Sequence, residues 1–267
     1  MSANFRDITI TSLETITVFK PLTGAYRFTL DELQDATISN TQDTVDITGK
    51  QGRRLNTLKR NKAVTISGNN GLISGGLMEL QVGSEFENLE STPVKWADYL
   101  KVSNDSAITT YKAVGTAGNE IIEVLVKDAN GVVTERLTQD ATAAEGKFAY
   151  APDTKTITFN TDELEDGTEI VVYYYRNVKG SRLENISDKY SEKGEIFIDA
   201  FGEDVCNKVY RVQFHIPRGD FSGNFDLTLG DDQTVHAFEI NSLAGNCGGS
   251  GALWDYTVFD SDAADAA

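Results

Sequence analysis

The sequence predicts a mainly β fold with a minor helical part. Runs of alternating apolar and polar residues recur along the chain, and clusters of turn residues separate them. The clearest run is Tyr210, Val212, Phe214 and Ile216, which alternates with polar residues as in a strand that has one buried face. Residues 74–82 differ, because their apolar side chains recur at helical spacing.

The first third of the chain is expected to be rich in strands, because β-branched residues dominate its apolar runs. Leu77 and Leu80 fall on one side of a helix, and Gly83 suits the left-handed position that ends one. The expected elements are strands at 8–19 and 26–30, one or two helical turns at 30–36, a strand from 37 into a long loop at 49–62, a short strand at 63–67, a turn at 68–71 and a helix at 74–82.

The middle of the chain, residues 93–178, predicts a separate β-rich subdomain. Residues 128–131 (Asp-Ala-Asn-Gly) form a strong hairpin signal between two apolar runs. Two further runs, at 156–159 and 169–175, are expected to pair with each other. Short strands with regular turns suggest a small sandwich of the immunoglobulin-like kind. This subdomain would be inserted into a core formed by residues 1–92 and 179–267.

The last third is the most regular part, and its expected strands each alternate apolar and polar side chains. A turn at 217–220 is expected to end the strand that contains Ile216, and another turn is expected at 230–232. The acidic tail at 260–267 is expected to fray. The expected strands are 195–199, 210–216, 225–229, 236–240 and 254–258.

The charge is large and unevenly distributed. The net charge is −17, which has the wrong sign for gripping nucleic acid but would let DNA slide past without adhering. Residues 1–92, 93–180 and 181–267 carry net charges of −2, −5 and −10. Against this trend, six basic residues lie together with no acidic residue between Asp46 and Glu79. They are Lys50, Arg53, Arg54, Lys59, Arg60 and Lys62.

The basic cluster has three interpretations: contact with nucleic acid, docking to the acidic region of a neighbouring copy, and an ordinary solvated loop. No aromatic residue lies between Lys50 and Lys62, which weakens the case for single-strand binding. Docking fits the charge asymmetry better. A patch that complements a different patch on the same protein gives head-to-tail contacts, which close into rings or extend as filaments.

No constellation of residues favours catalysis. His215 and His236 lie on neighbouring expected strands, and with Cys206 and Cys247 they have the residue types of a zinc site. Their spacing lacks the short ligand pairs of structural zinc sites, however. The glycine-rich stretch 245–251 lacks the lysine and the helix that a phosphate-binding loop needs. We therefore expect no enzyme activity, no cofactor and no metal.

The sequence also predicts a protein that is neither secreted nor membrane-inserted. The first residues lack a basic region followed by an apolar one, so no secretory signal is expected. No apolar run reaches the roughly 18 residues of a membrane-spanning helix. The two cysteines do not make a disulfide framework.

Two regions of the sequence resemble the major tail tube proteins of tailed bacteriophages, in a form that carries an inserted module. The first region combines 46–55 (DITGKQGRRL), 63–68 (AVTISG) and 76–83 (GLMELQVG). The second combines 209–218 (VYRVQFHIPR), 221–227 (FSGNFDL) and 232–239 (DQTVHAFE). Together the resemblance covers about two thirds of the chain.

The resemblance implies a β-sandwich or barrel with a flanking helix. Six copies would form a ring through continuous inter-subunit sheets, and rings would stack into a tube that conducts DNA. The long early segment, 49–62, would reach the adjacent ring, and residues 93–178 would face outward. The implied partners are other copies of the chain, the tape measure protein, the tail terminator, baseplate or tail-tip proteins, DNA in the lumen and a possible sheath. The implied location is the virion tail, after synthesis in the host cytoplasm.

Two alternatives to a tail tube stay open at this point. One is another phage structural protein, such as a head decoration, capsid or neck protein. The other is a carbohydrate-binding β-sandwich module, for which Tyr173, Tyr174 and Tyr175 would supply a stacking face unless they belong to the strand core.

Overall fold

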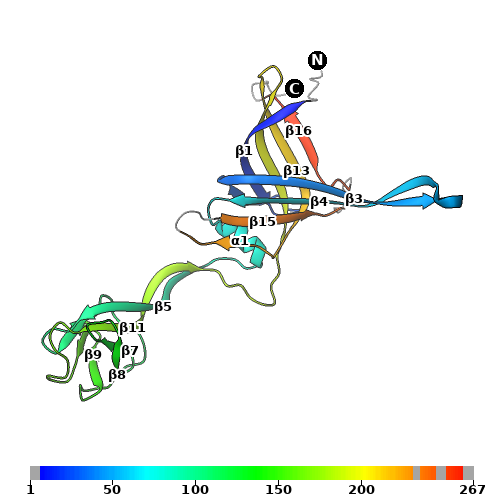
Figure 1. Ribbon diagram of the computed structural model, residues 1–267. Coiled ribbons are helices and arrows are strands. Elements are labelled where there is room, and N and C mark those ends of the chain that lie inside the picture. The colour runs from blue at the N-terminus through cyan, green and yellow to red at the C-terminus, as the bar shows by residue number, and fades with distance from the viewer. Residues whose placement is uncertain (1–6, 231–234, 245–250, 261–267) are drawn as a thin grey trace. The chain divides into compact units, whose positions relative to one another are not determined.

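The computed structural model describes residues 7–230, 235–244 and 251–260 (Figure 1). The chain divides into two compact units, and each is described by itself. The core unit comprises residues 1–86 and 183–267, and the inserted unit comprises residues 87–182. The turn expected at 230–232, the glycine-rich stretch, Cys247 and the acidic tail lie largely or wholly outside the described residues.

The core unit is one curled antiparallel sheet of nine strands. The order is β2-β1-β12-β13-β15-β4-β3, with β14 also paired to β15 and β16 to β13. Its strands are β1 (Ile8–Phe19), β2 (Tyr26–Leu30), β3 (Leu33–Thr48), β4 (Arg54–Asn70), β12 (Lys193–Asp204), β13 (Val209–Phe221), β14 (Leu227–Thr228), β15 (Val235–Ser242) and β16 (Asp255–Phe259). The prediction of a mainly β fold is confirmed.

The core of this unit is formed by every second side chain of its strands, as the alternation in the last third of the sequence predicted. Along β12, Ile196, Ile198 and Ala200 are buried while their neighbours are partly exposed. Phe238 and Ile240 of β15 are buried in the same way. β3 ends the sheet order far from β1, yet the two strands come into contact, so the sheet curls and encloses these side chains.

The predicted helix is present as α1 (Gly75–Val82). Ser74 caps its first turn, because the hydroxyl oxygen accepts a hydrogen bond from the Leu77 N–H at 3.3 Å. Gly83 ends it in the left-handed conformation, with φ of 70°. Leu77 and Leu80 are fully buried, so α1 is held by packing against the sheet as well as by its caps.

Several local predictions in the core unit are wrong. No helical turn forms at 30–36, because the chain passes from β2 to β3 there. The expected turn at 68–71 is mostly strand, and β13 runs through Pro217 to Phe221. The expected loop at 49–62 is a β-hairpin: β3 and β4 stay paired from Leu33 and Asn70 out to Thr48 and Arg54.

The inserted unit is a curled sheet of seven strands in the order β5-β11-β7-β8-β9-β10-β6. β8 and β9 are parallel, and the other pairs are antiparallel. Its strands are β5 (Glu87–Lys101), β6 (Ser106–Ile108), β7 (Ile121–Lys127), β8 (Val133–Gln139), β9 (Lys147–Ala151), β10 (Thr156–Thr158) and β11 (Glu169–Arg182). Because β5 and β11 stay paired as far as Glu87 and Arg182, the unit extends beyond the expected limits of 93 and 178.

The predicted β7–β8 hairpin around residues 128–131 is confirmed. The pairing predicted for 156–159 with 169–175 is wrong, because β10 pairs with β9 and β6 whereas β11 pairs with β5 and β7. The unit has its own core, centred on Phe148, Ile157 and Tyr174.

Candidate assembly surface

The outer half of the β3–β4 hairpin, residues 41–63, projects beyond the rest of the sheet (Figure 1). We call this segment the arm. β15 pairs with β4 only between Val64 and Asn70, so within the described residues the arm has no third strand. None of its residues is buried. A two-stranded ribbon alone is at best marginally stable in water, so this surface is suited to a partner.

The arm turns back on itself through a short 3₁₀ segment, Lys50–Gly52. The Gly49 N–H donates to the Arg53 carbonyl at 2.7 Å, which closes the turn. Gln51 and Gly52 have positive φ values, 67° and 73°, which such a tight reversal requires. The tip is therefore an ordered turn that presents Lys50 and Arg53 outward, both exposed.

One face of the arm carries an apolar patch, next to the facing residues Asp43 and Arg60. Residues directly opposite each other in an antiparallel pair point to the same face, and Val45 lies opposite Leu58 and Ile47 opposite Asn56. Ile47 is 41% exposed and Leu58 is 51% exposed. Leu55, 58% exposed, lies against Gly49 near the tip. These side chains form an apolar patch that no other described part of the core unit covers.

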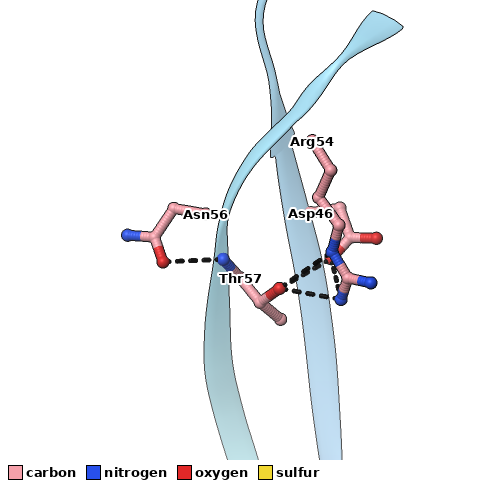
Figure 2. A network of polar contacts seen from close by, with 4 residues as sticks. All are labelled: Asp46, Arg54, Asn56 and Thr57. Carbon is pink, nitrogen blue, oxygen red and sulfur yellow. Dashed lines mark hydrogen bonds and ion pairs between the residues drawn. The ribbon is translucent and has the colours of Figure 1, made fainter.

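The other face is polar, and one contact network stiffens it (Figure 2). A guanidinium nitrogen of Arg54 lies 2.7 Å from the Asp46 carboxylate on the opposite strand. Arg54 also donates to the Thr57 hydroxyl, which in turn donates to Asp46 at 3.0 Å. The pair is exposed and contributes at most about 1 kcal/mol. Its effect is to hold Arg54 in place across the ribbon.

The arm carries six basic and two acidic residues on a chain of net charge −17. Within the described residues, only Arg54 of the six forms an ion pair, with Asp46. Asp43 lies opposite Arg60 in the ladder but accepts a hydrogen bond from Asn61 at 2.8 Å. Lys50, Arg53, Lys59, Arg60 and Lys62 form no ion pair with the described part of their own chain. The structure thus gathers all six predicted contact residues on one projecting ribbon.

A groove of about 660 Å³ lies at the base of the same hairpin, on the sheet face formed by β3, β4 and β15. Asp35, Asp226 and Glu239 are exposed along it. Asp35 is held by Asn69, whose backbone N–H donates to the carboxylate at 2.8 Å. Sequence reasoning placed acidic surface only late in the chain and missed Asp35. No sequence pattern marks Asp35, because it joins the groove only through the pairing of β3 with β4.

A second hollow, of about 550 Å³, lies between β3 and the strands β1, β12 and β13. Its walls are largely apolar and include Ile10, Ile38, Phe214 and Trp254. Ala36, Ile38 and Asn40 of β3 line this hollow and not the acidic groove, Thr37 lines only the groove, and Asp35 lines both. Because alternate residues of a strand point to opposite faces, the two hollows lie on opposite sides of β3.

The two histidines are held by separate partners. His236 is fully buried, and its Nε2 lies 2.7 Å from the Gln81 side-chain oxygen. Its Nδ1 accepts from the Ser74 N–H at 3.2 Å, so the ring is neutral and Nε2 carries the proton. Burial lowers the pKa of His236 below its usual value. His215 lies between Glu195 and Asp255, at 2.9 and 2.8 Å.

Within the described residues, no group of three or more His, Cys, Asp and Glu side chains could hold a metal ion. Cys206 is exposed and has a free thiol. No helix among the described residues is long and apolar enough to cross a membrane.

The three consecutive tyrosines do not share a face. Tyr174 is fully buried and donates to the Asp98 carboxylate at 2.8 Å, and its burial raises the pKa of its hydroxyl. Tyr173 and Tyr175 point to the opposite face of β11, where Lys95 lies over the Tyr173 ring at 5.4 Å. A stacking face made of all three tyrosines is therefore absent, and only Tyr173 and Tyr175 share a face.

The core unit is therefore a curled β-sheet with an exposed, charged arm. The model of the YomU/Tube protein family matches residues 8–252, nearly the whole chain. The chain belongs to this family, which indicates a tube-type structural protein of a phage. No curated protein matches the sequence at a significant level.

Proposed function

We propose that this chain self-assembles into stacked hexameric rings that form the tail tube of a phage and conduct its DNA. The observation that carries the proposal is the arm, because its cations and apolar patch find no cover among the described residues of the core unit. Membership of the YomU/Tube family supports it independently.

Rings would form through the sheet edges of the core unit. Among the described residues, β2 pairs only with β1 and β16 only with β13, so each has one open edge. Unpaired edges present rows of N–H and C=O groups that pair readily with another chain. Neighbouring copies can therefore continue one sheet around a ring. Head-to-tail contacts of this kind close into rings when the rotation between copies fits.

Stacking would depend on the arm. Lys50, Arg53, Arg54, Lys59, Arg60 and Lys62 would contact an acidic surface in the adjacent ring. Attraction between opposite charges sets the register and speeds the encounter more than it adds affinity. The inserted unit would then lie on the outside of the tube, where it does not obstruct stacking.

The remaining charge suits a conduit. Outside the arm the chain is strongly acidic, and an acidic inner wall would repel the DNA backbone and let it pass. The partners would be the tape measure protein, the tail terminator, baseplate or tail-tip proteins and, in a contractile tail, a sheath. The protein would be made in the host cytoplasm and reside in the virion tail.

Electron microscopy of the purified protein tests the proposal. The wild type should form tubes, and the variant with Arg53→Glu, Arg54→Glu and Arg60→Glu should stay unassembled while its circular dichroism is unchanged. A control with Lys95→Glu, Lys127→Glu and Lys155→Glu in the inserted unit makes the same charge change and should assemble. Wild-type protein that stays monomeric under all assembly conditions, or forms closed shells, would refute the tube.

A further inference from the structure

This inference deepens the proposed function and rests on it. We propose that the arm of a second copy adds to the free edge of β3, with its apolar face in the hollow beside β1, β12 and β13. Its basic face would then lie toward the acidic groove on the other side of β3. The proposal identifies the receptor surface of the arm within the core unit.

The receptor begins with an unpaired edge. β3 is the last strand of its sheet, and although β1 comes near it, no strand among the described residues is hydrogen-bonded to its outer edge. A strand added there would form backbone hydrogen bonds with β3. Its alternate side chains would then point into the two hollows, because neighbouring strands share the same pleat.

The two faces of the arm match the two hollows in chemistry. Val45, Ile47 and Leu58 form the apolar face, and the hollow beyond β3 is walled by Ile10, Ile38, Phe214 and Trp254. The hollow, about 550 Å³, has the size of typical binding pockets, so it can accept several aliphatic side chains.

The polar face matches by charge. Arg54 and Lys59 lie on it, since their ladder partners Thr48 and Thr44 alternate with Val45 and Ile47. The groove on the other side of β3 carries Asp35, Asp226 and Glu239, and none of these forms an ion pair within the described part of the chain. In the proposed orientation the facing residues Asp43 and Arg60 also point to the side of the apolar hollow. A ribbon added in reverse would instead place Arg54, Asp46 and Lys59 there, which is more strongly disfavoured.

The arm of the same subunit cannot be the occupant. Val45 and Ala36 lie on one continuous extended strand, so they are separated by about 30 Å at roughly 3.3 Å per residue. The patch and its receptor are therefore at opposite ends of one hairpin. Contacts between two such ends join copies head to tail, as stacking rings require.

Cross-linking between two single-cysteine proteins tests the inference. Both carry Cys206→Ser and Cys247→Ser, so each has only its introduced thiol. Proteins with a cysteine on the arm are mixed with proteins with a cysteine on β3, allowed to assemble, and treated with a short bis-maleimide. Because the two thiols are on different chains, only intermolecular contact can give a heterodimer.

Which pairs of positions cross-link should depend on the face of the arm that carries the cysteine. Leu58→Cys should cross-link to Ala36→Cys through the apolar hollow, and Lys59→Cys to Thr37→Cys through the acidic groove. The exchanged pairs, Leu58→Cys with Thr37→Cys and Lys59→Cys with Ala36→Cys, should give little heterodimer. All four positions are exposed or half-buried, so the substitutions should leave the fold intact.

Each other outcome overturns the inference in a distinguishable way. Tubes that form without any heterodimer, or with equal cross-linking in matched and exchanged pairs, would refute the receptor and leave the proposed function standing. Such a result would also arise if another segment, such as the chain's own first residues, fills the hollow. Absence of polymer in the wild type would refute the proposed function and the receptor together.

Discussion

The buried contact between α1 and β15 gives a quantitative prediction about the core unit. His236 is fully buried and links Gln81 on the helix to the Ser74 N–H at its start. Gln81, also buried, donates onward to the Ala237 carbonyl at 3.0 Å. Replacing His236 with Leu fills the space with an apolar side chain and removes both hydrogen bonds.

The expected loss of stability is the sum of the costs of two unsatisfied polar groups. The Gln81 oxygen would be left buried without a donor, and the half-buried Ser74 N–H would lose its acceptor. An orphaned buried polar group costs about 1–3 kcal/mol, and the partly exposed one less. The free energy of unfolding of the core unit should therefore fall by about 2–4 kcal/mol in His236→Leu.

Urea denaturation followed by tryptophan fluorescence measures this change. The chain has two tryptophans, Trp254 in the core unit and Trp96 in the inserted unit, so a Trp96→Phe background reports the core unit alone. The double variant His236→Leu, Gln81→Leu removes both partners. It should cost about 1–2 kcal/mol less than the sum of the single variants. Strictly additive losses would refute the coupling between helix and strand.

Two further predictions concern the same unit. Burial lowers the pKa of His236, so near and below pH 6.5 the unfolded chain binds more protons than the folded one. The free energy of unfolding should therefore be complete above pH 6.5 and fall as the pH drops below it. Denaturation midpoints at several pH values should show this fall, and it should weaken in His236→Leu. Gly83→Ala should destabilise more than Gly24→Ala in thermal melts: both glycines have positive φ, but an added Cβ would lie 2.0 Å from the Tyr190 carbonyl oxygen at Gly83 and meets nothing at Gly24.

The sequence predicts elements well where a buried face imposes a pattern. The alternation of β12 and β15 and the spacing of Leu77 and Leu80 reflect a core that each element must face, and these predictions are confirmed. Which strands pair with each other is harder to predict from the sequence, because a local pattern does not encode which strand lies alongside. The strands near 156 and 169 form as expected, but each pairs with other neighbours.

The returning strand of the arm, residues 54–62, was missed for the same physical reason. With no buried residue between 41 and 63, the arm lacks the periodicity that a core imposes, and the basic residues at 50–62 suggested a loop. Val45, Ile47 and the threonines around them did predict the outgoing strand. The acidic groove could not be predicted as a unit, since Asp35 and Glu239 come together only through the pairing of β3, β4 and β15.

An exposed ribbon with an apolar patch is an aggregation hazard, and its charge limits the ways in which it can be covered. Two arms that met through their patches would bring two sets of six cations together, and like charges disfavour such symmetric pairing. The base of the hairpin has an acidic groove on one side of β3 and an apolar hollow on the other, so it can contact both faces of an arm at once. The charge on the arm thus favours contacts between different surfaces over contacts between identical ones. Contacts between different surfaces give a growing ring or tube, whereas contacts between identical surfaces give a closed dimer.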